Sequence, residues 1–344
     1  MVRLGAMGDI LHALPAVTAL RLAHPAWEID WVVEPRWRAL LAVQGAVSGG
    51  PQQPVVDRLY FAPTKDWRES PLSGKTTHEI NALRRQLRST LYNAVLDLQG
   101  AIRSAVVGRM AGCPRLIGES APREAAARFL FTERVATTGA HVIEQDLELA
   151  SAVAGDTLTH VAPLLPVDLT AEAWCDNLLA SSGTRPVALI NPGAGWGAKR
   201  WPVERYAAVA RGLSVRGFRI LVNAGPGEES MADTIVKGTS GAAIPLATSL
   251  EQLVALTRRV ALCVAGDTGP LHLACALGRP VVGIYGPTDP SRNGPFGTRF
   301  KVLRSPLSRR DHTRHPEPEA GLLTIAPEDV LRAADELLAG ESTP

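Results

Sequence analysis

The stretch GDTGPLHLACALGRPVVGIYGPTDP, residues 266–290, decides the fold. The apolar run VALCVAG (260–266) leads into it, a turn and a short helical pattern follow, and a second apolar run, PVVGIYG (280–286), comes next. Near-continuous apolar strands separated by a helix are typical of a parallel sheet covered on both faces. Pro270 suits the first helical position because it lacks only an N–H that would be unpaired there, and Gly278 suits the helix end.

The same alternation extends through most of the chain and predicts an α/β protein. Further strand candidates are IDWVV (29–33), AVLDLQG (94–100), VALINPG (187–193) and RILVNAG (219–225), and amphipathic helix candidates include residues 203–217 and 249–259. Two such sets, which lie before and after the proline-containing stretch 163–170, predict two Rossmann-like domains.

The predicted boundaries follow from that linker. The first domain is expected over residues 1–162 and the second over 163–325, with a last helical segment, 326–344, that contains PEDVLRAADELLAG (327–340). The sequence leaves open which domain this segment packs against, including a return to the first. Only Met1–Leu4 precede the first glycine turn, so the first strand is expected to be short or to begin abruptly.

The composition of the 344 residues is that of a globular protein, with 46% hydrophobic and 20% charged residues. No apolar run reaches the ~18–20 residues that span a bilayer, and the first residues, MVRLGAMGD, contain no apolar stretch of the signal-peptide type. The four cysteines, at 113, 175, 263 and 275, are too scattered for a metal or redox motif, so buried free thiols are expected. These features predict a cytoplasmic protein.

The charge distribution is uneven although the net charge is only +2. Residues 58–128 contain twelve Lys and Arg against six Asp and Glu. Such a zone attracts an anionic partner or simply forms solvated helix faces, and the counts alone leave both open. Aromatic residues in the zone follow no stacking pattern, which argues against nucleic acid.

The turn at 266–272 indicates a site for an anionic ligand. Thr268, Gly269 and the residues after Pro270 present backbone N–H groups at a helix start, and such a start favours an anion. Thr268 adds a hydroxyl and His272 an imidazole, a set that suits a diphosphate. Asp267 would repel a phosphate but suits sugar hydroxyls. The alternative is a satisfied helix cap, with Asp267 or Thr268 as the N-cap and no ligand.

A second glycine turn near the N-terminus carries another carboxylate. In RLGAMGDILH (3–12), Asp9 is placed to cap the helix ILHALPAVTALRLA, and capping is the simple interpretation. A role as a general base is the other.

Two further turns follow predicted strands of the second half. NPGAGWGAKRWP (191–202) contains three glycines and Lys199, which suits a phosphate as a point charge, while Trp196 and Trp201 are expected to pack. AGPGEE (224–229) places Glu228 at another strand end, where ligands of parallel sheets bind. No turn has the GxGxxG pattern and no P-loop is present, which argues against a dinucleotide oxidoreductase and a P-loop enzyme.

With these motifs the chain resembles the glycosyltransferases that transfer heptose from ADP-heptose to the inner core of lipopolysaccharide (glycosyltransferase family 9), heptosyltransferase I more than II. RLGAMGDILHALPAV (3–17), GAKRWP (197–202) and residues 266–290 carry the resemblance, which covers nearly the whole chain. It implies the GT-B architecture, two Rossmann-like domains facing a cleft, with the acceptor on the first and the donor on the second. It also implies an inverting reaction without metal or cofactor.

The resemblance assigns roles residue by residue. It makes Asp9 the catalytic base and places Lys199 at the departing phosphate. It places Asp267 at the heptose, and Arg103 and Arg123 at the anionic sugar acid Kdo. The remaining donor-site positions are the diphosphate group Thr268, Gly269, Pro270 and His272, Glu228 at the ribose and Thr248 at the adenine pocket.

The implied partners are a nucleotide sugar and Kdo-lipid A, with peripheral contact at the cytoplasmic face of the inner membrane and no nucleic acid. Two alternatives stay open: a transferase for another sugar or acceptor, as in heptosyltransferase II, and a nucleotide-binding module without catalysis.

Overall fold

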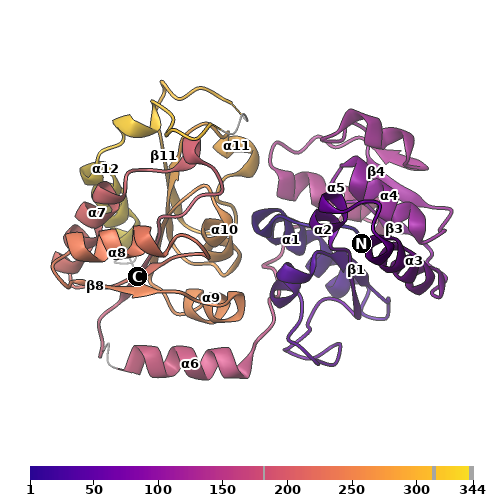
Figure 1. Cartoon of the computed structure of the whole chain (residues 1–344), viewed down its shortest axis with the longest axis horizontal. Helices are drawn as coiled ribbons and strands as arrows, with labels where there is room; N and C mark the ends of the chain where they lie inside the picture. The colour runs from indigo at the N-terminus through magenta and orange to yellow at the C-terminus, as the bar shows by residue number, and fades with distance from the viewer. Residues whose placement is uncertain (181–182, 312–314, 341–344) are drawn as a thin grey trace. The chain divides into compact units, whose positions relative to one another are not determined.

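The computed structural model describes residues 1–180, 183–311 and 315–340, and the chain divides into two compact units, Met1–Val167 and Asp168–Pro344 (Figure 1). The division falls inside the proline-containing stretch 163–170.

The first unit alternates strands and helices. Its elements are α1 (Met7–Ala23), β1 (Asp30–Val33), η1 (Pro35–Leu40), β2 (Arg58–Phe61), α2 (Thr64–Glu69), α3 (Gly74–Arg88), β3 (Val95–Leu96), α4 (Ile102–Met110), β4 (Leu116–Glu119), η2 (Ala125–Phe129), β5 (Glu133–Val135) and α5 (Val142–Ala154).

The short N-terminal segment Met1–Leu4 joins the strands of this unit. Val2 bridges in parallel to Val32 of β1 on one side and to Asp97, just after β3, on the other. Backbone hydrogen bonds from Val2 N to the Leu96 carbonyl (2.9 Å) and from Val32 N to the Met1 carbonyl (2.9 Å) support both pairings. With β1–β2 and β3–β4–β5 pairing in parallel, the spatial order is β2, β1, residues 1–4, β3, β4, β5. This is the strand order of a Rossmann sheet, and the expectation of a short first strand is confirmed.

The second unit has the same design. Its elements are α6 (Leu169–Leu179), β6 (Val187–Asn191), η4 (Gly197–Lys199), α7 (Val203–Val215), β7 (Arg219–Asn223), α8 (Glu229–Gly238), β8 (Ala243–Leu246), α9 (Leu250–Thr257), β9 (Leu262–Gly266), α10 (Gly269–Ala276), β10 (Val281–Tyr285), α11 (Pro290–Asn293), β11 (Phe300–Arg304), η5 (Leu322–Thr324) and α12 (Pro327–Ala339). The six-stranded sheet has the order β11-β10-β9-β6-β7-β8, and all its pairings are parallel. The Rossmann order recurs, with the reversal between β6 and β9.

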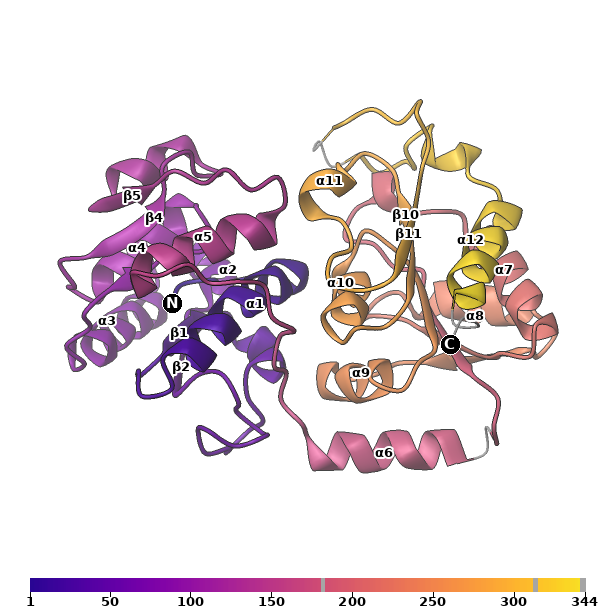
Figure 2. The ribbon, with the colours of Figure 1, turned by 180° about the vertical axis from the view of Figure 1, so that it is seen from behind.

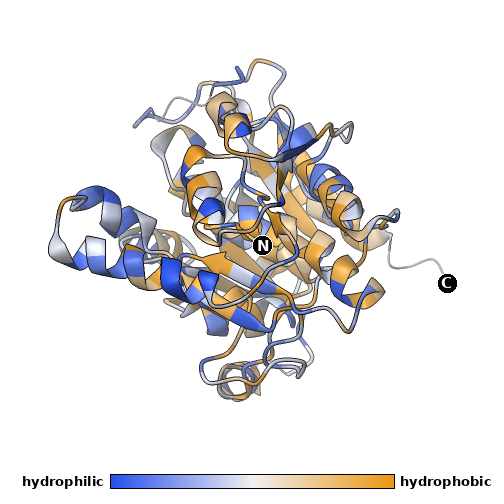
Figure 3. Cartoon of the chain, turned by 90° about the vertical axis from the view of Figure 1, so that its right-hand side faces the viewer, coloured by the Kyte–Doolittle hydropathy of each residue, from blue (hydrophilic) through white to orange (hydrophobic). Residues whose placement is uncertain are grey.

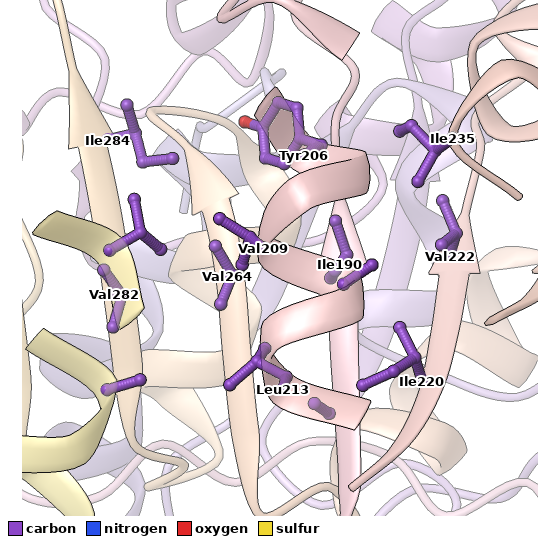
Figure 4. Packing of buried hydrophobic residues seen from close by; sticks show 14 of the residues in the cluster. Ile190, Tyr206, Val209, Leu213, Ile220, Val222, Ile235, Val264, Val282 and Ile284 are labelled. Atoms are coloured by element: carbon purple, nitrogen blue, oxygen red, sulfur yellow. The ribbon is translucent and has the colours of Figure 1, made fainter. Parts of the chain in front are cut away.

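The larger core cluster of the second unit lies between its sheet and helices α7, α8 and α12. Tyr206, Val209 and Leu213 of α7 are buried over the strands, among residues such as Ile190 and Val264 (Figure 4). Strand residues are mainly hydrophobic, whereas helices show polar outer surfaces (Figure 3). Burial of this apolar area stabilises the unit by about 25 cal/mol per Å².

The last helix, α12, belongs to this core. Val330, Ala334 and Leu337 are buried in the same cluster, and α12 contacts α7, β10 and β11 (Figure 2). Of the two domains that the sequence left open, the second is therefore the one whose core contains α12. The apolar face of α12 is fully used on the second sheet.

Two expectations from composition can be compared with the structure. All four cysteines are buried and free, as predicted. None of the helices in the described part of the chain combines the length and apolar character needed to cross a membrane.

Candidate functional site

The predicted donor-site residues gather at the carboxyl edge of the second sheet. Ligands of Rossmann sheets bind where the strand order reverses, here beyond the ends of β6 and β9. The loops after β6, β7, β8 and β9 carry, respectively, Lys199, Glu228, Thr248 and the 267–272 group.

The centre of this edge is a charged cluster around Asp267. The Asp267 carboxylate binds Lys199 Nζ through Oδ2 (2.5 Å) and His272 Nε2 through Oδ1 (3.1 Å). Its side chain is only 8% exposed, and those of Lys199 and His272 are 14% and 6% exposed. The Lys199 ammonium compensates the charge of this buried carboxylate, and the His272 ring occupies its second oxygen, so removing Lys199 would leave a buried charge without a cation.

The pKa of Asp267 reflects this balance. Burial acts to raise it, but the hydrogen bond from His272 and the charge of Lys199 outweigh burial and bring the pKa of the carboxyl well below its usual range. The group is therefore an anion at neutral pH. It holds the Lys199 ammonium on one oxygen and the His272 ring on the other, which fixes a cation at this edge of the sheet.

The start of α10 differs in detail from the predicted cap. Thr268 is the N-cap by position, but its hydroxyl donates to the Gly266 carbonyl (3.2 Å) and accepts no hydrogen bond from the helix. Asp267 does not cap the helix either. Gly269 is the first helical residue and Pro270 the second, one position later than predicted. Thr268 thus takes the predicted N-cap position without a side-chain cap, and the first turn of α10 has no hydrogen bond from a capping side chain.

Lys199 is positioned by a single turn of 3-10 helix, η4. Its ammonium lies 5.1 Å from the centre of the Trp196 ring, so this tryptophan contacts the cation. Trp201 is 1% exposed and donates its indole N–H to the Ile325 carbonyl (3.2 Å), as expected of a packing residue.

Glu228 turns back over the glycines of two loops. Its Oε2 accepts the N–H of Gly225 at 3.1 Å. A Cβ atom at Gly193 would lie 1.9 Å from the same oxygen. Gly193 therefore leaves the space that the carboxylate occupies, and the loops after β6 and β7 meet at Glu228.

A hydrogen-bonded chain that the sequence analysis missed runs beneath these loops. The Thr248 hydroxyl donates to Asn223 Oδ1 (2.8 Å), and Asn223 Nδ2 donates to Asn191 Oδ1 (3.1 Å). Both asparagines are buried at the last position of a strand, β7 and β6. The available signal was an asparagine closing two otherwise apolar strands, VALIN and RILVN.

In the first unit, Asp9 lies inside helix α1 and not at its N-cap. Ala6 is the N-cap, and Asp9 is the third helical residue, whose Oδ2 accepts the Ala6 N–H at 3.0 Å. The predicted capping position is therefore wrong, although the carboxylate still satisfies a free N–H. Asp9 Oδ1 also pairs with the buried Arg3 (3.3 Å). The side chain of Asp9 keeps 32% exposure, so its oxygens are open to a ligand.

Arg103 and Arg123 both flank the turn that follows β3. Glu124 N donates to the Gly100 carbonyl (2.9 Å), and the Glu124 carboxylate accepts the N–H of Ile102 (2.8 Å). This brings the 123–124 peptide to the first turn of α4, which carries Arg103. Both arginines are exposed at the same edge of the sheet.

The buried Asp97 supports this turn. Its Oδ1 accepts the N–H groups of Gln99 and Gly100, both at 2.8 Å. Burial raises the pKa of Asp97 despite those hydrogen bonds. Asp97 thus closes the turn from the buried side, while Arg103 and Arg123 lie on its exposed side.

Comparison with known proteins gives the family of the chain. Residues 80–322 match the model of the family described as glycosyltransferase family 9 (heptosyltransferase). The chain belongs to glycosyltransferase family 9. This family 9 transferase is 30% identical over 317 residues to lipopolysaccharide heptosyltransferase 1 of Escherichia coli K12, covering 89% of this chain and 93% of that protein. It is 27% identical to the enzyme of the same name from Pseudomonas aeruginosa, covering 86% and 81%.

Solved structures of related proteins share the fold of the transferase. E. coli heptosyltransferase WaaC with ADP superposes with a TM-score of 0.78 and 27% identity, covering 98% of each chain. A family 9 glycosyltransferase from Veillonella parvula superposes with a TM-score of 0.82 and 21% identity, covering 98% of this chain and 96% of that one. The predicted GT-B fold class, with two Rossmann-like units, is confirmed. Within the described ranges, no group of three His, Cys, Asp or Glu side chains is arranged to hold a metal ion.

Proposed function

We propose that this transferase moves heptose from ADP-heptose to the Kdo residue of the lipopolysaccharide inner core. The observation that carries the proposal is the cluster of Lys199, Asp267 and His272 at the reversal point of the second sheet. The relatives from E. coli and P. aeruginosa described above are each named lipopolysaccharide heptosyltransferase 1. One related structure, of E. coli WaaC, contains ADP-2-deoxy-2-fluoro heptose.

In this proposal the second unit binds the donor. The diphosphate takes the first turn of α10, at Thr268, Gly269 and Pro270, and Lys199 and His272 donate to its oxygens. Glu228 accepts from the ribose, Thr248 lines the adenine pocket and Asp267 receives a heptose hydroxyl.

The first unit binds the acceptor. Arg103 and Arg123 bind the carboxylate of Kdo, since exposed guanidinium groups match a carboxylate with two parallel hydrogen bonds. Because the acceptor is lipid-linked, the transferase is expected to act at the cytoplasmic face of the inner membrane as a peripheral protein.

The reaction is a single displacement. The acceptor hydroxyl attacks the anomeric carbon of heptose on the face opposite ADP, its proton passes to Asp9, and ADP leaves with the electron pair of the broken bond. Attack on the opposite face inverts the anomeric configuration. Lys199 and His272 stabilise the charge that develops on the leaving phosphate, and removing one such donor typically costs ~10²–10³ in rate.

The test is a transfer assay with ADP-heptose and Kdo-lipid A, with the product mass measured. The expected product is heavier by one heptose, and the Asp9→Asn variant should form none. A second assay uses an acceptor that already carries one heptose, which is the acceptor expected for heptosyltransferase II. Transfer to that acceptor alone, or to neither, would contradict the proposal.

A further inference from the structure

One segment of the second unit has no direct part in the proposed reaction. It contacts the turn that carries Lys199. It comprises residues 305–311 and 315–325, between β11 and α12, and we call it the connector. Ala198, next to Lys199, donates its N–H to the His315 carbonyl (3.0 Å), and its own carbonyl accepts the Glu319 N–H (3.2 Å). Both backbone groups of Ala198 are thus bonded to the connector.

The connector also packs directly against the start of this turn. A Cβ atom at Gly197 would lie 1.5 Å from the Pro316 carbonyl oxygen and 2.7 Å from the Pro316 Cα. These are backbone atoms, so no side-chain movement could make room. The turn therefore has no freedom to shift backwards while the connector stays in place.

One carboxylate fixes the connector in that shape. Glu319 Oε2 accepts from the Ser308 hydroxyl (2.8 Å) and the Leu322 N–H (2.9 Å), and Oε1 accepts from the Arg309 N–H (3.3 Å). Burial acts to raise the pKa of Glu319. The hydrogen bonds that its carboxylate accepts from Gly321, Ser308, Leu322 and Arg309 outweigh burial and bring the pKa below its usual range. Glu319 thus joins both parts of the connector as an anion, while its backbone binds Ala198.

The side chain of Lys199 leaves this turn toward the proposed donor site. Lys199 reaches Asp267 at 2.5 Å across the sheet edge. We propose that Glu319 is a positioning residue, which holds the Ala198–Lys199 peptide so that the Lys199 ammonium stays at the donor phosphate. This inference rests on the role proposed above for Lys199. Glu319 itself touches no substrate.

The test is a double-mutant cycle between Glu319→Ala and Lys199→Ala, read both as the Kd of ADP by calorimetry and as kcat for transfer. With Lys199 present, Glu319→Ala should weaken ADP binding ~5-fold and lower kcat ~10-fold, less than the loss of a whole donor. In the Lys199→Ala background the same change should alter either quantity less than ~2-fold, because coupled residues are not additive. A purely structural residue would cost the same in both backgrounds.

The matched control is Glu317→Ala, an exposed carboxylate two positions away that should leave both quantities unchanged. If Glu319→Ala fails to fold, Ser308→Ala and Glu319→Gln remove fewer hydrogen bonds and run through the same cycle. Equal losses in both backgrounds, or none in either, overturn the positioning role and leave the proposed function intact. A Lys199→Ala variant with unchanged ADP binding and transfer overturns the role of Lys199 and the inference with it.

Discussion

Replacing Gly193 by alanine tests whether the Glu228 carboxylate holds the donor. The added Cβ would lie 1.9 Å from Glu228 Oε2 and 2.3 Å from its Cδ. To regain an ordinary carbon–oxygen separation of about 3.3 Å, that oxygen must move by roughly 1.4 Å. The movement breaks its 3.1 Å hydrogen bond with the Gly225 N–H and carries it away from the ribose position.

The size of the effect follows from that displaced group. A hydrogen bond to a charged group contributes about 1.5–3 kcal/mol, so losing it at the ribose should raise the Kd of ADP about 10-fold to 100-fold. The fold should tolerate the change, because the clashing atoms belong to the end of a flexible side chain and Gly193 has no left-handed φ. We therefore expect the variant to fold, with a loss of unfolding free energy no larger than the about 1.5–3 kcal/mol of the broken hydrogen bond, offset in part by the about 0.4–1 kcal/mol that Gly→Ala contributes.

The assay is calorimetric titration with ADP alongside thermal unfolding without ligand. Gly195→Ala is the matched control, because a Cβ there meets nothing within 4 Å, and it should bind ADP like the wild type. In a Glu228→Ala background, Gly193→Ala should cost no further affinity. Two results would refute the role given to Glu228. One is an unchanged Kd of ADP in the Gly193→Ala variant, and the other is a Gly193→Ala effect on the Kd that is as large in the Glu228→Ala background as in the wild type.

Three more predictions concern the other groups. Asp9→Asn should lower transfer by ~10²–10⁴-fold and leave the Kd of ADP unchanged, and rapid transfer by this variant would remove Asp9 as the base. Arg103→Gln with Arg123→Gln should raise KM for the acceptor without changing the Kd of ADP, whereas Arg109→Gln at the other end of α4 should change neither. The depressed pKa of Asp267 adds stability above its unfolded-state pKa of about 3.9, and this is lost as pH falls. Denaturant unfolding at pH 7 and pH 3 should therefore show a smaller acid loss for Asp267→Asn than for wild type, and equal losses would contradict the ion cluster.

The sequence predicted the buried central strands of the second unit well, and two of the strands it missed lie at sheet margins. The predicted runs at 187–193, 219–225, 260–266 and 280–286 coincide with β6, β7, β9 and β10, each buried at every position. The edge strands β2 and β11 are fully buried at no position and contain charged residues, so no apolar run marks them. Hydrophobicity identifies strands covered on both faces and says little about the sheet margin.

The candidate site divides in the same way. Motif residues at a turn, such as Lys199 and Asp267, could be named from the sequence because glycines and a proline mark the turn. Their direct contact could not, since 68 positions separate them and only the sheet brings the two loops together. Asn191 and Asn223 were missed because a lone buried amide at a strand end has no local pattern.

The two units place their polar groups by the same rule. In the second unit, the first and fourth strands, β6 and β9, end beside each other, and the loop after each contributes to the Lys199–Asp267 pair. In the first unit, residues 1–4 and β3 are the corresponding strands, and the helices that follow them, α1 and α4, carry Asp9 and Arg103 in their first turns. At both reversal points neighbouring helices diverge, so side chains there do not have to fill a core. In the second unit a carboxylate and a cation from loops distant in sequence are thus held together at the sheet edge, and the first unit carries Asp9 and Arg103 at the equivalent edge, as the proposed binding of two anionic substrates requires.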